Sequence, residues 1–193
     1  MKSFAFACAL AVAAAAVPAG AVTVIGATKV TVTNALNTWL QVAELQAFSF
    51  SNVNVALASN GATATGTGGA YDVFATPDKA IDGNTGGGYY TDTIFHPAVE
   101  AGTQLDINFA SATNLESLTI WGRTDCCQSR DSYIVTIFGG NTVLYSGTLN
   151  AFGAPVTVMF DAVPEPENWV LLVAGFGLVG ATMRRRQRTA ITA

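Results

Sequence analysis

The residues best equipped for chemistry lie in one ten-residue stretch, Trp121 to Arg130. This stretch holds Arg123, Asp125 and Arg130, and His96, the single histidine of the chain, precedes Arg123 by 27 positions. Each guanidinium is a planar, charged fork of hydrogen-bond donors, and an imidazole can add one more donor. Charge-assisted hydrogen bonds contribute about 1.5 to 3 kcal/mol each, so three such groups could select one hydroxyl-rich ring. Asp125 is expected to hold the arginines in place and offset their mutual repulsion.

Basic residues are scarce outside the two ends of the chain. Residues 22–163 contain eleven acidic residues and four basic ones, a formal net charge of −7. The four basic residues are Lys29, Lys79, Arg123 and Arg130. This excess of negative charge argues against nucleic acid and anionic lipid as partners, and it suits a cation site.

The N-terminus has the layout of a secretory signal peptide. Lys2 is followed by an apolar run over residues 4–17 and by the small residues Ala19, Gly20 and Ala21. This order is typical of a signal over residues 1–21 that is removed on export. The alternative, a short buried helix, fits an Ala-rich run starting at Met1 less well.

Export places the remaining chain in an oxidising compartment, where cysteines can pair. Cys8 would leave with the signal, so Cys126 and Cys127 have only each other. We expect a disulfide between these two neighbours. The alternative is a pair of ordinary buried thiols.

The C-terminus combines a proline motif, an apolar span and a basic cluster. Pro164, Glu165 and Pro166 precede the uncharged residues 169–183, and four arginines follow within residues 184–188. A spanning helix needs about 20 apolar residues, so residues 169–183 predict a short transmembrane helix whose arginines stay in the cytoplasm. The alternative, a buried C-terminal helix, would not call for four terminal arginines.

These C-terminal residues, VPEPENWVLLVAGFGLVGATMRRRQR, resemble the PEP-CTERM sorting signal of Gram-negative bacteria. The resemblance covers about the last 26 residues and makes residues 164–188 the sorting segment. It implies that an exosortase recognises Pro164, Glu165 and Pro166. It also implies transient anchoring in the inner membrane, followed by delivery to the cell surface or extracellular matrix.

Between the two ends the apolar residues alternate with polar ones, which predicts an all-β domain. Leu105, Ile107 and Phe109 share one face of an expected strand, and Leu118 and Ile120 share a face of the next. The expected strands are residues 29–33, 39–50, 53–56, 104–109, 115–121, 133–138, 142–145 and 155–160. About eight short strands, with a hairpin turn at residues 139–141, indicate a sandwich or jelly roll. Residues 60–69 and 77–97 are expected to be loops, the second functional because it carries His96.

The set His96, Arg123, Asp125 and Arg130, with the words RTDCCQSR and AIDGN, resembles the signature of the F-type, fucose-binding lectins. That family belongs to the discoidin-like (F5/8 type C) galactose-binding domains. The resemblance covers about residues 52–140. It implies that residues 22–163 form a galactose-binding-domain-like jelly roll that binds fucosylated or related glycans.

The resemblance assigns a role to each residue of the sugar site. His96, Arg123 and Arg130 would contact the ring oxygen and the 3- and 4-hydroxyls of α-L-fucose. The Cys126–Cys127 disulfide would be a rigid apolar plate for the ring's edge. The fucose methyl group would lie against Tyr89 and Tyr90, with Tyr71 as a weaker candidate; the alternative is that these rings only cover the loop. Thr93, Ile94 and Phe95 depart from the Cys-Thr stretch that the family has before its histidine.

The resemblance also implies a structural calcium ion, which takes six to eight oxygen ligands. The carboxylate of Asp82 would bind it with oxygens of Lys79, Asn84 and Thr93. The closing glutamate of the family is absent after Tyr133 before the sorting segment, but WLQVAELQAF at residues 39–48 is similar to the family's last strand. A circularly permuted chain would then supply Glu44 and the Ala43 carbonyl. The alternative for residues 82–84 is a plain Asx turn.

Three classes of function were weighed. A non-catalytic lectin is expected from the complete His, Arg, Asp, Arg set. An enzyme is not expected, because His96 has no nucleophile beside it in sequence and no separated pair of acids marks a cleft. The remaining alternative is a structural matrix protein with a discoidin-like fold and no sugar specificity.

Overall fold

The computed structural model describes residues 22–162 and 173–179. The predicted signal peptide (1–21), the Pro164, Glu165 and Pro166 motif and the arginine-rich tail lie outside the described residues. Residues 173–179, within the predicted span 169–183, are helical. Of the helices that the structure describes, none is long and apolar enough to cross a membrane.

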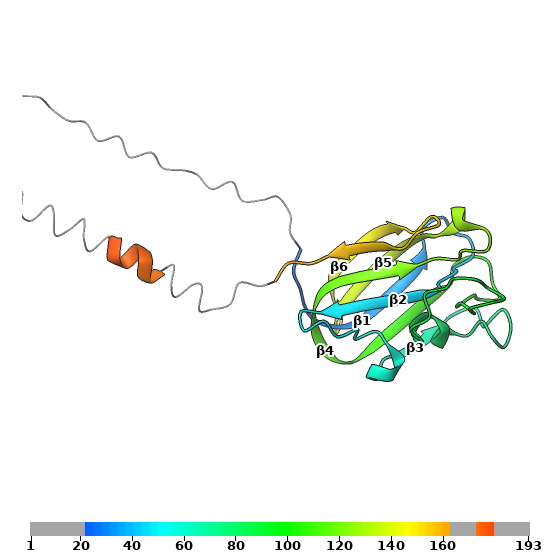
Figure 1. Ribbon diagram of the computed structural model, residues 1–193, viewed down its shortest axis with the longest axis horizontal. Coiled ribbons are helices and arrows are strands. Elements are labelled where there is room, and N and C mark those ends of the chain that lie inside the picture. Colours follow the sequence, from blue (N-terminus) through cyan, green and yellow to red (C-terminus); the bar gives the residue numbers. More distant parts are fainter. Residues whose placement is uncertain (1–21, 163–172, 180–193) are drawn as a thin grey trace, which may run out of the picture.

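Seven strands within the described residues form one antiparallel sheet system, which confirms the all-β prediction with one strand fewer than expected (Figure 1). The strands are β1 (Val24–Asn34), β2 (Glu44–Ser49), β3 (Thr63–Gly66), β4 (Gln104–Trp121), β5 (Ser132–Gly139), β6 (Thr142–Asn150) and β7 (Val156–Met159). Three short 3-10 helices, η1 (Ala58–Asn60), η2 (Pro77–Ile81) and η3 (Gln128–Arg130), lie in the connections. The expected hairpin turn joins β5 to β6, with Gly140 at φ 59°.

Strand β4 is the element that connects the two sides of the sheet system. Its first half pairs with β1, Gln104 opposite Thr33, and with β3, whereas its second half pairs with β2, Trp121 opposite Glu44, and with β7. The exposed residues between the halves mark where the strand curves, at the pale-green bend of Figure 1. This pairing is consistent with a β-sandwich.

The core between these strands follows the alternation of the sequence. Leu105, Ile107, Leu118 and Ile120 are fully buried, and Phe109 is nearly so. The intervening residues of β4 are mostly exposed or half-buried. Period-two patterning therefore identified the inward faces correctly.

Several strand predictions were wrong in their extent. Residues 53–56 form only an isolated bridge, Asn54 to Phe48, and the expected strand 39–50 is regular only over Glu44–Ser49. The expected loop 60–69 contains β3. The two strands predicted at 104–109 and 115–121 are one continuous strand, because backbone pairing with β1 continues through the polar residues between them.

The loops and the chain ends lie at opposite ends of the molecule (Figure 1). The backbone N–H of Asp161 donates to the carbonyl oxygen of Val22 at 3.0 Å, so the first and last described residues of the domain are neighbours. At the other end, the Asn34 side chain donates to the carbonyl oxygens of Trp39 (3.0 Å) and Arg130 (2.7 Å). These bonds tie the connection after β1 to the loop before β5.

Candidate functional site

A hollow of about 220 Å³ opens among the loops at this end. Its lining residues are Trp39, Gln41, Tyr71, Tyr89, Tyr90, His96, Arg123 and Arg130. Pockets for drug-sized ligands usually measure about 300 to 1,000 Å³, so this one suits a smaller ligand such as a monosaccharide. Five of the residues predicted to bind sugar therefore converge on one hollow, although they come from two connections far apart in sequence, residues 82–103 and 122–131.

Backbone hydrogen bonds hold His96 from both sides. Its neighbour Phe95 exchanges both backbone bonds with Val42, at 3.1 and 2.8 Å. The N–H of His96 donates to the carbonyl oxygen of Ala75, and its own carbonyl accepts from Tyr71 at 2.8 Å. A loop anchored in this way can place a side chain as reproducibly as a strand does.

The imidazole of His96 is only 6% exposed, and its Nδ1 lies 2.8 Å from the carbonyl oxygen of Pro97. Because a carbonyl can only accept, Nδ1 carries the proton. Burial lowers the pKa of His96, and the charges of Arg123 and Arg130 lower it further. At neutral pH the ring is therefore uncharged and Nε2 is an acceptor, which corrects the expectation that His96 adds a donor to the ligand.

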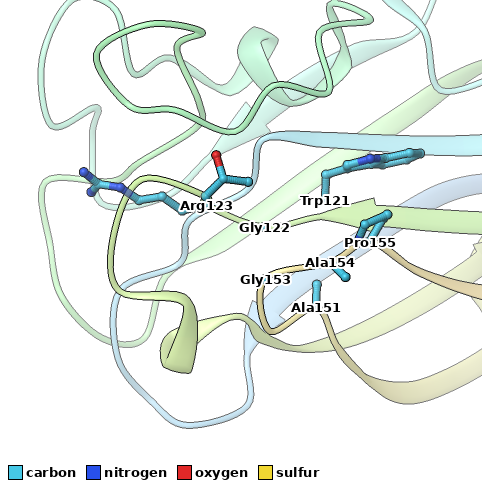
Figure 2. Close-up of a pocket in the computed structure, with 8 residues that line it drawn as sticks. Trp121, Gly122, Arg123, Ala151, Gly153, Ala154 and Pro155 are labelled. Carbon is cyan, nitrogen blue, oxygen red and sulfur yellow. The ribbon is translucent and has the colours of Figure 1, made fainter.

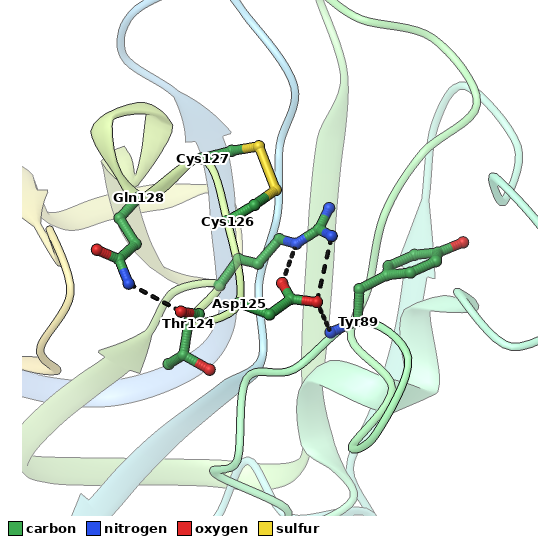
Figure 3. Close-up of a disulfide and its surroundings, with 7 residues drawn as sticks. Tyr89, Thr124, Asp125, Cys126, Cys127 and Gln128 are labelled. Carbon is green, nitrogen blue, oxygen red and sulfur yellow. Dashed lines mark hydrogen bonds and ion pairs between the residues drawn. A yellow bond between two sulfur atoms is a disulfide. The ribbon is translucent and has the colours of Figure 1, made fainter.

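Arg123 lies two residues after the end of β4 and is fixed by Asp125. Its Nε donates to Asp125 Oδ1 at 2.5 Å and its Nη2 to Oδ2 at 3.4 Å, while Oδ2 also accepts from the Tyr89 backbone N–H at 3.1 Å (Figure 3). The guanidinium lies 4.9 Å from the centre of the Tyr89 ring. The pKa of Asp125 is lowered, chiefly by its hydrogen bond from Arg123. The carboxylate thus joins the arginine loop to the tyrosine loop.

Arg130 ends the 3-10 helix η3 just before β5 and is held by its backbone. Its N–H donates to the carbonyl oxygen of Cys127 at 2.9 Å. Among the described residues no carboxylate lies within salt-bridge distance of its guanidinium. Asp125 therefore pairs with Arg123 alone, not with both arginines as expected, and the donors of Arg130 remain available to a ligand.

A glycine permits the close approach of the two loops that carry Tyr89 and Arg123. Gly87 adopts φ 75°, and a Cβ there would lie 2.8 Å from the carbonyl oxygen of Gly122. The Thr124 N–H donates to the Gly87 carbonyl at 2.8 Å, and the Thr124 hydroxyl donates to the Gly86 carbonyl at 2.9 Å. A side chain at position 87 would push these loops apart.

Aromatic rings surround His96 on three sides. The centres of the Trp39, Tyr71 and Tyr89 rings lie 5.0, 4.8 and 5.7 Å from the imidazole centre. Tyr89 is buried and its hydroxyl donates to Asp72, whereas Tyr90 is 87% exposed at the rim. That hydrogen bond is the main cause of the lowered pKa of Asp72. Tyr71 also lines the hollow, so the weaker candidate of the sequence lies in the site.

A disulfide joins Cys126 to Cys127, as predicted (Figure 3), and in the sequence it lies between Arg123 and Arg130. Neither cysteine lines the hollow, so the expected plate against a sugar edge is not part of its wall. Cys127 adopts the left-handed conformation, φ 61°, and precedes η3. The disulfide therefore lies where it can shape the loop that carries Arg130.

A second hollow lies behind Arg123 and is much smaller, about 40 Å³. It is lined largely by Trp121 and by small residues of the β6–β7 connection, and Figure 2 shows the Arg123 side chain extending away from them. A space this size holds water molecules rather than a ligand, because one water needs about 10 to 15 Å³.

The predicted calcium residues are brought together in part. Glu44, at the start of β2, is 0% exposed, and each of its carboxylate oxygens lies 3.2 Å from the backbone N–H of Gly83. Burial, with a smaller contribution from the nearby charge of Asp82, raises the pKa of Glu44 from 4.5 to about 8. A buried acid with an acidic neighbour suits a bound cation.

The other predicted calcium ligands are partly engaged in hydrogen bonds and ion pairs of their own. The Asp82 carboxylate accepts from the Asn84 N–H at 2.8 Å, the bond of the Asx turn, and lies 3.9 Å from Lys79 Nζ. Asn84 donates its side-chain amide to the Asp92 carbonyl at 2.8 Å.

Thr93 adopts φ 59°, a left-handed conformation that is rare for a β-branched residue and costs about 1 to 3 kcal/mol. Ala43 is buried beside Glu44, its N–H bonded to the Trp121 carbonyl at 2.9 Å. Within the described residues no three His, Cys, Asp or Glu side chains form a metal-binding group, so calcium would depend on Glu44, Asp82 and neutral oxygens.

Sequence reasoning missed Trp39 and Gln41 as residues of the hollow. They precede β2 and are far in sequence from the loops of the motif. A signal was present, because positions 39 and 41 alternate with Leu40 and Val42, which belong to the main core. Their side of the chain faces the loops that carry His96.

Comparison with known proteins gave no match: no protein-family model, curated protein or solved structure matches this chain.

Proposed function

We propose that this chain is a non-catalytic carbohydrate-binding protein of the fucose-binding lectin class. The observation that carries the proposal is the convergence of His96, Arg123 and Arg130 on one hollow of about 220 Å³ whose other lining residues, apart from Gln41, are aromatic. Two guanidinium groups and a neutral imidazole offer donors and an acceptor to hydroxyls. The aromatic rings offer apolar surface to C–H groups.

The charges and hydrogen-bonding groups of the hollow can serve a polar ligand. The positive charge of Arg123 is matched by Asp125, and that of Arg130 has no carboxylate partner among the described residues. A sugar hydroxyl can accept from Arg130 and donate to His96 Nε2 without bringing a charge into the site. We propose α-L-fucose as the preferred ring, with its methyl group against Tyr89 and Tyr90.

We propose that the fold is a circularly permuted, galactose-binding-domain-like jelly roll with a structural calcium ion. The adjacency of Val22 and Asp161 supports permutation, since joined termini are a small change in a compact domain. The position of Glu44 beside the 82–84 turn supports the calcium. Glu44 and Asp82 would hold it, and it would fix the loop that leads to Tyr89.

Export and sorting complete the proposal. The chain would be anchored transiently in the inner membrane and processed by an exosortase, then displayed on the cell surface or in the matrix. Residues 22 and 162 lie on one side of the domain, and the connections that supply the lining residues of the hollow lie on the other, so an anchor at these ends would leave the site open (Figure 1). A millimolar monosaccharide site is worth about 4 kcal/mol, and many displayed copies would raise its effective strength.

A glycan array tests this proposal with the purified wild-type chain and three variants. Fucosylated glycans should bind wild type and lose binding in Arg123→Ala and Arg130→Ala. Lys29→Ala removes one positive charge far from the hollow and should bind like wild type. Binding that ignores both arginine changes, or no glycan binding at all, would favour a structural matrix protein with no sugar specificity.

A further inference from the structure

Gln41 is an unexplained polar residue in the wall of the hollow. It is 0% exposed, yet neither Nε2 nor Oε1 of its amide has a hydrogen-bond partner among the described residues. Buried polar groups are nearly always paired, and an unpaired one destabilises the fold. In the protein without ligand this buried amide therefore destabilises the fold, and it lies in the wall of the hollow, where a ligand could pair it.

The backbone around Gln41 is held firmly. Its carbonyl oxygen accepts from the Tyr133 hydroxyl, which also lies 3.0 Å from Asp131 Oδ1 in the core. The next residue, Val42, is bonded through both backbone groups to Phe95. The backbone that carries this amide is thus held in place between the core and the hollow, as a residue that discriminates between ligands requires.

We infer that Gln41 is a specificity-determining residue whose amide hydrogen-bonds a hydroxyl of the bound sugar. This inference rests on the proposed function and adds a group outside the motif. The arginines only donate and neutral His96 only accepts through Nε2, whereas an amide does both and so suits a hydroxyl. A sugar without that hydroxyl would leave the buried amide unpaired and be rejected.

The test compares Gln41→Met with wild type by calorimetric titration with L-fucose and by thermal unfolding. Methionine keeps the length of the side chain and removes its donors and acceptor. Affinity should fall about tenfold or more, because a buried hydrogen bond to the sugar is lost. The unfolding temperature without sugar should stay the same or rise, since an unpaired amide has been removed. Gln46→Met, on β2 away from the hollow, is the matched control and should bind like wild type.

Monodeoxy analogues of L-fucose identify the hydroxyl through a double-mutant-type cycle. Wild type and Gln41→Met should bind with equal affinity the one analogue that lacks the hydroxyl contacted by the amide. For the other analogues the difference in affinity between the two proteins should remain. If Gln41→Met binds L-fucose like wild type, the inference is overturned. It is also overturned if the variant has a lower unfolding temperature without sugar and loses the same factor in affinity for every analogue, because the amide is then structural. In that case the proposed function still stands if wild type binds L-fucose and the Arg130→Ala variant does not. Wild type that binds no sugar overturns both.

Discussion

His96 donates through Nδ1 to the carbonyl oxygen of Pro97, 2.8 Å away, which leaves Nε2 as the acceptor of an imidazole that lines the hollow. The lowered pKa of His96, caused first by burial, keeps this arrangement at neutral pH. Protonation would turn Nε2 into a donor and add a third positive charge beside Arg123 and Arg130. The site is therefore built for an uncharged imidazole.

Sugar affinity should consequently be constant above about pH 6.5, the ordinary pKa of histidine, and fall as the pH drops below the lowered value. Titrations with L-fucose between pH 4.5 and 8 would show this. Asp131 also titrates in this range, because burial raises its pKa to about 7. His96→Gln should bind more weakly but without the pH dependence. If the slope persists in His96→Gln, Asp131 rather than His96 is its cause.

Asp125→Asn should weaken sugar binding about tenfold with little change in fold stability. The substitution weakens the charge-assisted bonds to Arg123 and leaves the guanidinium less firmly oriented, while the exposed position limits the effect on unfolding. Asp106→Asn is the matched control, because Asp106 faces Lys29 at 3.9 Å away from the hollow. Equal losses of affinity in both variants would mean that general charge, not the orientation of Arg123, matters.

The Cys126–Cys127 disulfide should affect binding more than stability. A bond between adjacent residues closes almost no loop, so it removes little entropy from the unfolded chain. Its local effect is on the backbone between Arg123 and Arg130. The double variant Cys126→Ser, Cys127→Ser should lose about tenfold in affinity, a difference of about 1.4 kcal/mol, with an unfolding temperature close to that of wild type. A large drop in that temperature with unchanged sugar affinity would contradict this role.

The fold was predictable where burial imposes an alternation of apolar and polar residues on the sequence. It was not predictable where packing leaves no such pattern in the sequence. The alternation of Leu105, Ile107 and Phe109 predicted a buried strand face. The sequence of β3, in contrast, is typical of a loop because it ends in Gly66. That glycine is required by packing, since a Cβ there would lie 2.8 Å from the Phe95 ring. No local rule reveals such a contact between residues 29 positions apart.

The site was predictable to the extent that its residues form a compact motif. His96, Arg123 and Arg130 were named from spacing and residue type, and they share a hollow. Gln41 and Trp39 were missed because their role depends on how β2 pairs with the end of β4, Glu44 opposite Trp121. The pairing of Arg130 was wrong for a similar reason: sequence proximity to Asp125 does not determine which arginine the carboxylate contacts.

Calcium should change the pH dependence of stability through Glu44. The folded pKa of this acid, about 8, is above its ordinary value of 4.5, so the folded state favours the protonated form. Stability of the calcium-free protein should therefore be highest below pH 4.5 as far as Glu44 is concerned, and should fall as the pH rises from 4.5 to 8. A bound cation would stabilise the ionised acid and restore stability at pH 8.

Thermal unfolding in chelator and in millimolar calcium, at pH 5 and pH 8, measures this effect. Wild type should show a calcium-induced rise in unfolding temperature that is larger at pH 8. Glu44→Gln should show little rise at either pH, although Asp131, whose pKa of about 7 is also raised by burial, will still lower stability with rising pH. The exposed Glu100→Gln variant should respond like wild type. A wild-type protein that ignores calcium at pH 8 would mean that Glu44 holds no metal.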